Sequence, residues 1–223
     1  MRDLTLLIPA KFEKESLPMV LNDLKKFNCK KLIIVKKEDN TTIKSIAKFK
    51  KYILYQKGNG YGNALVEGIK KTKTKYFCIF NADGSFQSKE LPHMYNLLSK
   101  NNKTDFIFAS RYEKNASSED DTLLTKIGNF FFTKLGNILF KLTITDILYT
   151  FVMGHTNKVR QLKLSSQDFA FCVEFPIKAK KCGMNLISCP SNEKRRMAGK
   201  KKVNEFKDGF IILKYMIFSF FNK

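Results

Sequence analysis

A chain of 223 residues with 43% hydrophobic and 27% charged residues can bury a sizeable core, which argues against intrinsic disorder. No apolar run reaches the ~18–20 residues of a membrane-spanning helix and no signal-peptide pattern opens the chain, so we expect a cytoplasmic protein. The net charge of +21 fits nucleic acid, an anionic membrane or a phosphorylated substrate, or a lysine-rich composition alone. Nucleic acid is disfavoured because no motif for binding it accompanies the charge.

Apolar runs alternate with helical patterns in the first half of the chain. Strands are expected at residues 4–9, 31–35, 52–55, 76–80 and 105–110. Helices are expected at residues 16–27, 42–50, 61–72 and 91–100. This alternation predicts a parallel sheet with right-handed crossovers, and the nearly continuous apolar strands indicate helices on both faces.

The second half is less regular. Residues 123–142 form an apolar, helix-like stretch, and later residues fit short elements: a strand at 149–153, a helix at 174–181 and a strand at 186–189. The end of the chain, residues 209–221, is strongly apolar but too short to span a bilayer. We predict one domain over residues 1–205 and an apolar C-terminal helix over residues 206–223 that faces an acceptor or a membrane surface.

Three glycines, Gly58, Gly60 and Gly62, lie between a predicted strand and a predicted helix. Such a loop lets backbone N–H groups approach a phosphate, and the N-terminus of the helix adds about half a positive charge. The spacing fits neither the dinucleotide fingerprint nor a Walker loop. An ordinary glycine turn explains the segment equally well.

The strand at 76–80 ends in the sequence Asn81-Ala82-Asp83-Gly84. Ligands of parallel α/β sheets bind in the crevice beyond the carboxyl ends of the strands. A divalent cation that also holds a diphosphate needs only one or two protein carboxylates. Asp83 could serve in that way, with Asn81 offering a neutral oxygen, whereas a plain Asn-Asp-Gly turn is the alternative.

Cations follow at two later points. Arg111 closes the strand at 105–110, where it could grip a phosphate or form a surface salt bridge. Residues 192–202, with the sequence NEKRRMAGKKK, concentrate lysine and arginine far more than the rest of the chain.

In this order the segments resemble the family 2 glycosyltransferases, and within them the dolichyl-phosphate mannose synthase-like and related polyprenyl-phosphate sugar transferases. The resemblance is carried by LIPAKFEKESL, GNGYGNALVEGI, NADGSF, SRY and RRMAGKKKV. Asp146 with Phe151, and residues 171–174, are similar to two further family elements. The resemblance implies an α/β, Rossmann-like GT-A fold with a mostly parallel sheet flanked by helices.

The family resemblance also implies an enzyme of cell-envelope polysaccharide synthesis. The enzyme would move a sugar, with inversion, from a nucleotide-sugar to a polyprenyl-phosphate or glycan acceptor. It would use Mg²⁺ or Mn²⁺. Asp83 and Asn81 would hold the metal. The donor would be bound by Pro9, Glu13, Glu38, Asp39, Gly60, Gly62, Asn81 and Asp83. Phosphates of donor or acceptor would be held by Arg111, Arg196 and Lys202. Catalysis would fall to Asp83, Arg111 and the candidate bases Asp168 and Glu174.

Several positions depart from the family pattern. Phe12 replaces an Asn. Lys36 and Lys37 stand where the pattern has acids, unless a shift of two residues in the alignment brings Glu38 and Asp39 into those places. Asn81, Ser85 and Cys172 replace an Asp, a Gln and an Asp, respectively. A noncatalytic protein that keeps the fold and binds nucleotide-sugar or membrane is therefore the alternative. Apolar residues 127–142 and 210–221, with the cations of 195–202, would hold the protein at the cytoplasmic face of the inner membrane; core or dimer interface is the other interpretation.

Overall fold

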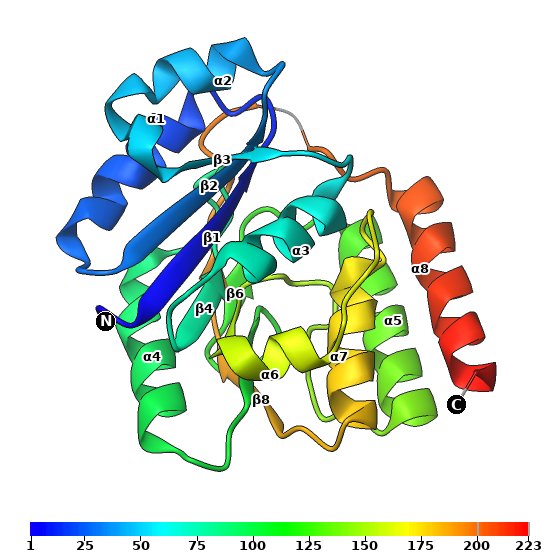
Figure 1. Ribbon diagram of the computed structural model, residues 1–223. Coiled ribbons are helices and arrows are strands. Elements are labelled where there is room, and N and C mark those ends of the chain that lie inside the picture. The colour runs from blue at the N-terminus through cyan, green and yellow to red at the C-terminus, as the bar shows by residue number, and fades with distance from the viewer. Residues whose placement is uncertain (200, 223) are drawn as a thin grey trace.

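The computed structural model describes residues 1–199 and 201–222; Lys200 of the basic segment and Lys223 at the end of the predicted C-terminal helix lie outside the described residues. Figure 1 shows a central sheet with helices on both faces. In the described chain the order of its strands is β3-β2-β1-β4-β7-β5-β8, and β6 pairs with β9 in a separate ribbon. The strands are β1 (Leu4–Ala10), β2 (Lys30–Lys36), β3 (Ile53–Gln56), β4 (Tyr76–Ile79), β5 (Phe106–Ser110), β6 (Ser117–Ser118), β7 (Val152–His155), β8 (Leu186–Pro190) and β9 (Asn192–Glu193).

The helices follow the predicted alternation closely. They are α1 (Ser16–Asp23), α2 (Asn40–Ser45), α3 (Tyr61–Lys71), α4 (Leu91–Lys100), α5 (Leu123–Phe140), α6 (Thr156–Gln161), α7 (Phe171–Lys181) and α8 (Glu205–Phe221). The predicted helix at 42–50 is shorter than expected, because α2 ends early and a 3₁₀ segment, Ala47–Tyr52, follows it. Helix α6 was not predicted.

The core has two halves, one on each face of the sheet. Successive side chains of β1 point to opposite faces. Leu6 therefore packs with Leu21 of α1 and Met94 of α4, while Leu7 packs with Leu65 of α3 on the other face. The prediction of an α/β fold with a mostly parallel sheet covered on both faces is confirmed.

One strand breaks the parallel pattern. β7 lies antiparallel between β4 and β5, so these two strands do not pair with each other. Gly154 permits this insertion, because a Cβ at that position would collide with the ring of Phe106. The sequence predicted a strand at 149–153, close to β7, but alternation alone could not show its direction.

The C-terminal helix α8 packs against α5 and α7. Ile212 and Met216 of α8 belong to the buried core on that face of the sheet. Figure 1 shows α8 at the outer edge of the molecule, beside α5. The division of the chain at residue 205 stays a prediction. Among residues 1–199 and 201–222, no helix combines the length and hydrophobicity needed to cross a membrane.

Candidate active site

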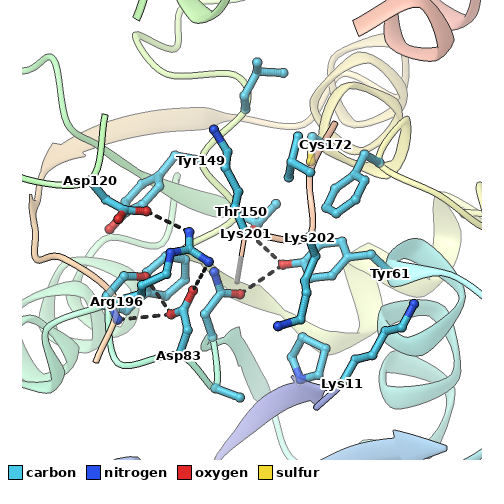
Figure 2. Close-up of a pocket in the computed structure, with 18 of the residues that line it drawn as sticks. Lys11, Tyr61, Asp83, Asp120, Tyr149, Thr150, Cys172, Arg196, Lys201 and Lys202 are labelled. Atoms are coloured by element: carbon cyan, nitrogen blue, oxygen red, sulfur yellow. Dashed lines mark hydrogen bonds and ion pairs between the residues drawn. The ribbon is translucent and has the colours of Figure 1, made fainter. Parts of the chain in front are cut away.

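A pocket of about 650 Å³ opens beyond the carboxyl ends of β1, β2 and β4. Its other walls come from α3, α5, the start of α7 and the segment that leads to α8 (Figure 2). Of the predicted site residues, the lining includes Pro9, Glu13, Gly60, Asn81, Asp83, Arg111, Arg196 and Lys202. The expected crevice at the edge of the sheet is therefore present.

Asp83 lies in the pocket with one carboxylate oxygen already engaged. Its Oδ1 accepts hydrogen bonds from the backbone N–H of Ser85 at 3.1 Å and from the Ser85 hydroxyl at 2.8 Å. Its Oδ2 lies 4.0 Å from the guanidinium of Arg196, and the side chain is only 15% exposed. The Oδ1 of nearby Asn81 accepts a hydrogen bond from the hydroxyl of Tyr61 at 3.1 Å.

These two side chains fit a metal that is shared with a ligand. The described residues contain no group of three or more His, Cys, Asp and Glu side chains that could hold a metal ion alone. Mg²⁺ bound together with a diphosphate takes one or two protein carboxylates and completes its shell with phosphate oxygens and water. Asp83 supplies one such carboxylate, and Asn81 supplies a neutral oxygen beside it.

A strap, defined here as residues 194–199, crosses over the Asp83 turn. The backbone N–H of Lys194 donates to the Ser85 carbonyl at 3.0 Å, and that of Met197 donates to the Asp83 carbonyl at 2.8 Å. Gly84 has φ +81°, and a Cβ there would lie 2.6 Å from Met197. Glycine is thus required by both the backbone conformation and the close approach of the strap.

The strap brings cations to the Asp83 end of the pocket. Arg196 donates to Asp120 at 2.7 Å while facing Asp83, and Figure 2 draws the three side chains together. Beyond the strap, Lys202 lies 3.2 Å from Oε1 of Glu13. The predicted phosphate-binding residue Arg196 is therefore placed near the predicted metal ligand, and Lys202 lines the same pocket beside Glu13.

Arg111 reaches the pocket with its guanidinium already paired. It donates to Asp146 at 2.7 and 3.0 Å, to Asp121 at 3.1 Å and to Glu193 at 3.2 Å. Burial raises the pKa of Glu193 above its ordinary value, although the nearby guanidinium acts in the opposite direction. Three carboxylates around one arginine form a structural node, so a phosphate would have to compete with them. The phosphate-binding role of Arg111 stays a prediction.

The two acids predicted after the second strand lie outside the pocket lining. Glu38 is exposed, whereas Asp39 is buried at the start of α2. Asp39 accepts hydrogen bonds from the backbone N–H of Phe12 at 2.7 Å and from the hydroxyl of Thr42 at 2.7 Å. Burial opposes ionisation of Asp39, but these hydrogen bonds outweigh it and hold its pKa below the ordinary value. Asp39 thus fixes the loop that follows β1, and its contact with a nucleotide stays a prediction.

The glycine loop packs against the segment before α7. A Cβ at Gly60 would collide with the Gln167 carbonyl oxygen, and a Cβ at Gly62 would lie 2.6 Å from the Asp168 carbonyl oxygen. Gly60 also has φ +92°. Only glycine permits this approach of two backbone segments. The structure therefore gives these glycines a packing role, and Gly60 also lines the pocket.

The two candidate bases differ in their environment. Asp168 is half-buried, and its Oδ1 accepts a hydrogen bond from the backbone N–H of Ala170 at 2.9 Å. Glu174 is fully buried, and it accepts hydrogen bonds from backbone N–H groups at 2.9 and 2.8 Å and from Lys178 at 2.7 Å. Neither residue lines the pocket, although Phe169 beside Asp168 does.

Other pocket residues were not predicted. Tyr61 stacks on Phe169 with ring centroids 5.1 Å apart, and its hydroxyl also pairs with Thr150 at 2.7 Å. Asn129 of α5 lines the same wall, as does Cys172, which the sequence marked only as a departure from the family pattern. The position of Tyr61 between Gly60 and Gly62 was the available signal; Thr150 and Asn129 carried none.

Comparison with known proteins places the fold. No curated protein matches this sequence significantly. Glucosyl-3-phosphoglycerate synthase from Mycobacterium tuberculosis, solved with uridine diphosphate, superposes with a TM-score of 0.74 at 10% identity, covering 98% of this chain and 80% of that chain. Its complex with Mn²⁺, UDP-glucose and phosphoglyceric acid gives 0.74 at 11% identity, with the same coverage. The complex with Mg²⁺ and uridine diphosphate gives 0.72 at 12%, covering 98% and 79%. These matches confirm the predicted GT-A fold.

Sequence comparison adds the family. Residues 5–162, more than half of the chain, match the family described as glycosyl transferase family 2. The matched range contains all but the first residue of β1, together with the glycine loop, the Asp83 turn and Arg111. The predicted family is confirmed, whereas the dolichyl-phosphate mannose synthase-like subgroup stays a prediction. The chain belongs to glycosyl transferase family 2 and is a glycosyltransferase.

Proposed function

We propose that this protein moves a sugar, with inversion, from a nucleotide-sugar donor to a polyprenyl-phosphate or glycan acceptor. The observation that carries the proposal is the gathering of Asp83, Arg196, Lys202 and Glu13 around one pocket at the carboxyl ends of the parallel strands. These residues come from distant parts of the sequence. The carboxyl edge of such a sheet is where α/β proteins bind nucleotides.

The donor would lie with its nucleoside near β1 and its diphosphate near Asp83. Pro9 and Glu13 follow β1 and line that end of the pocket. The cations Lys11, Lys36, Arg196 and Lys202 line the pocket too, and arginine and lysine stabilise phosphate oxygens. Related structures bind uridine diphosphate or UDP-glucose, which supports a uridine nucleotide as the first donor to test.

Asp83, with Asn81 beside it, would hold Mg²⁺ or Mn²⁺, the ions found in the related complexes. A bound divalent cation would offset the charge that develops on the departing diphosphate. Arg196 faces the same place from the strap and would stabilise the same charge through its guanidinium. Before the donor binds, Asp120 keeps this guanidinium paired at 2.7 Å.

Titration calorimetry with uridine diphosphate and Mn²⁺ tests donor binding. We expect Asp83→Ala to weaken binding by at least about tenfold in the presence of Mn²⁺, since one charged ligand of the ion is lost. The matched control is Asp105→Ala, which removes a carboxylate outside the pocket lining and should bind like the wild type. Equal affinities of Asp83→Ala and wild type would contradict the proposed site.

A noncatalytic role is the second candidate, because Asn81 and Cys172 replace acids of the family pattern. A turnover assay distinguishes an active glycosyltransferase from a noncatalytic binding protein. Wild-type protein that binds uridine diphosphate with Mn²⁺ but releases none from UDP-sugars, with glycan and polyprenyl-phosphate acceptors supplied, would be a binding protein.

We also propose that the protein binds peripherally to the cytoplasmic face of the inner membrane. Of the sixteen large hydrophobic side chains exposed in the described chain, six lie on α5 and six on α8. Helix α5 carries no acidic residue, and exposed lysines such as Lys134 and Lys214 are interspersed among the apolar side chains. An apolar helix face with lysines suits the surface of an anionic bilayer.

A further inference from the structure

One buried hydrogen-bond donor in the pocket wall has no partner among the described residues. Asn129 lies on α5, lines the pocket and is only 1% exposed. Its Oδ1 accepts a hydrogen bond from the backbone N–H of Leu148 at 3.1 Å, which sets the orientation of the amide. Its Nδ2 makes no hydrogen bond within residues 1–199 and 201–222. A buried donor left unpaired is unfavourable, so an oxygen of a ligand would stabilise this site.

The wall around this amide carries no net charge. We call it the α5 end of the pocket, and it consists of Asn129, Leu148, Thr150, Tyr61, Phe169 and Cys172. Burial raises the pKa of the Cys172 thiol to about 12, so the thiol is neutral at physiological pH. Figure 2 shows Cys172, Tyr61 and Thr150 on the same side of the pocket, away from Asp120. Aromatic faces, hydroxyls and an amide are the groups that sugars contact in proteins.

A group of carboxylates next to Thr125 of α5 disfavours an anion at this end. Thr125, one turn before Asn129, donates to Asp121 at 3.2 Å, and Asp121 is one of three carboxylates around Arg111. One guanidinium with three carboxylates leaves a formal charge of −2 there. Of the other cations of the lining, Lys11 follows β1, Lys36 ends β2, Arg196 faces Asp83 and Lys202 pairs with Glu13, whereas Lys201 pairs with Glu205 at the start of α8. Arg196 and Lys202 thus favour a phosphate at the donor end, and the carboxylates around Arg111 disfavour one beside Thr125 at the α5 end.

We propose that the α5 end of the pocket is the acceptor subsite, that it takes a neutral, hydroxyl-bearing sugar, and that Nδ2 of Asn129 donates to one of its oxygens. This inference rests on the proposed function and selects the glycan acceptor over the polyprenyl-phosphate. In the transfer, a hydroxyl oxygen of the acceptor bonds to the anomeric carbon of the donor sugar. The bond from that carbon to the diphosphate breaks, the nucleoside diphosphate leaves with the electron pair, and the hydroxyl proton passes to solvent water.

Two variants on α5 test the role of Asn129. Asn129→Asp keeps an oxygen for the Leu148 N–H, removes the unpaired donor and adds negative charge. Asn137→Ala is the control, because Asn137 lies on the same helix, bonds the Ile144 carbonyl through its Nδ2 at 3.2 Å and does not line the pocket. Thermal melting of each variant checks that the fold is retained.

Binding is measured by saturation-transfer NMR and titration with a panel of p-nitrophenyl glycosides, 3-phosphoglycerate and farnesyl phosphate, with and without uridine diphosphate and Mn²⁺. We expect at least one glycoside to bind the wild type and Asn137→Ala alike, and Asn129→Asp to bind it at least about tenfold more weakly. Uridine diphosphate should bind all three proteins equally.

Three results would overturn the inference: no glycoside binds, the phosphorylated compounds bind in preference, or Asn129→Asp binds glycosides like the wild type. If the wild type does not bind uridine diphosphate, that result would instead contradict the proposed donor site. Since glycosides are also titrated without the nucleotide, the two failures are distinguishable.

Discussion

Asp39 shows how a residue outside the pocket can shape it. Phe12 occupies the left-handed region at φ +56°, where an Asn is tolerated far better than a bulky residue. Asp39 accepts the Phe12 N–H and also bonds Thr42, whose hydroxyl in turn accepts the Glu13 N–H at 2.9 Å. The carboxylate thus holds the loop that carries Glu13 into the pocket. These hydrogen bonds stabilise the strained conformation of Phe12, which stands where the family pattern has an Asn.

Glu174 yields a test of how a buried carboxylate contributes to stability. We expect Glu174→Gln to lower the free energy of unfolding at pH 7 by about 1.5–3 kcal/mol, because hydrogen bonds from Ser165, Ser166 and Lys178 are lost or weakened. Burial opposes ionisation of Glu174, yet these bonds hold its pKa below the ordinary 4.5. A lowered pKa stabilises the fold above the value of the unfolded chain, and the effect disappears as pH falls through the folded value.

The difference between wild type and Glu174→Gln should therefore be full at pH 7 and shrink below pH 4.5. Urea unfolding at several pH values measures it. Glu205→Gln is the control, since Glu205 also pairs with a lysine, Lys201 at 2.6 Å, but on the surface, where such a pair contributes little. A difference that stays constant to the lowest pH at which both proteins fold would show that ionised Glu174 does not stabilise the fold.

At the scale of elements, whether a glycine can be replaced depends on what packs against it and not on its place in a motif. Gly62 lies in the first turn of α3 against the carbonyl oxygens of the segment before α7, whereas a Cβ added at Gly128 of α5 would meet no described atom within 4 Å. Both are helical and neither has a positive φ. The two positions therefore isolate the effect of packing from that of backbone conformation.

We expect opposite signs for the two alanine substitutions. Gly128→Ala should raise the free energy of unfolding by about 0.5–1 kcal/mol, because alanine restricts the unfolded chain and favours the helix. Gly62→Ala should lower it, since the new methyl group forces Asp168 and its neighbours away from α3. Urea unfolding measures both values. If Gly62→Ala is as stable as Gly128→Ala, the two segments do not need this contact.

Much of the fold and part of the site could be predicted, because they depend on local patterns. Apolar runs and glycine turns predicted the first five strands, and the carboxyl ends of these strands predicted the place of Asp83 and Arg111. The direction of β7 could not be predicted, since it depends on long-range pairing with β4 and β5. Asn129 was missed because its significance lies in a hydrogen bond that it does not make within the described chain.

At the scale of the whole molecule, the pocket adjoins α5 and α8, the two helices that carry most of the exposed apolar side chains. Asn129 lines the pocket from α5, while Phe130 and Phe131 of the same helix are 64% and 50% exposed. The strap leads from the Asp83 turn towards α8, whose Phe210 and Phe218 are 69% and 66% exposed. A membrane surface beneath α5 and α8 would thus contact the same helix that carries Asn129, which suits a sugar carried on a lipid.

Sedimentation with vesicles tests this arrangement. We expect the protein to pellet with phosphatidylglycerol vesicles at low salt, to pellet less at high salt because lysine charges are screened, and to remain in solution with phosphatidylcholine. Replacing Phe210 and Phe218 together by Ser should weaken binding at least about tenfold, since each buried Phe contributes about 1.5–3 kcal/mol. Met19→Ser on α1, which removes a 49% exposed apolar side chain elsewhere, should bind like the wild type. Failure to pellet with anionic vesicles at low salt, together with self-association that the Phe variant abolishes, would instead assign this face to contacts between copies of the chain.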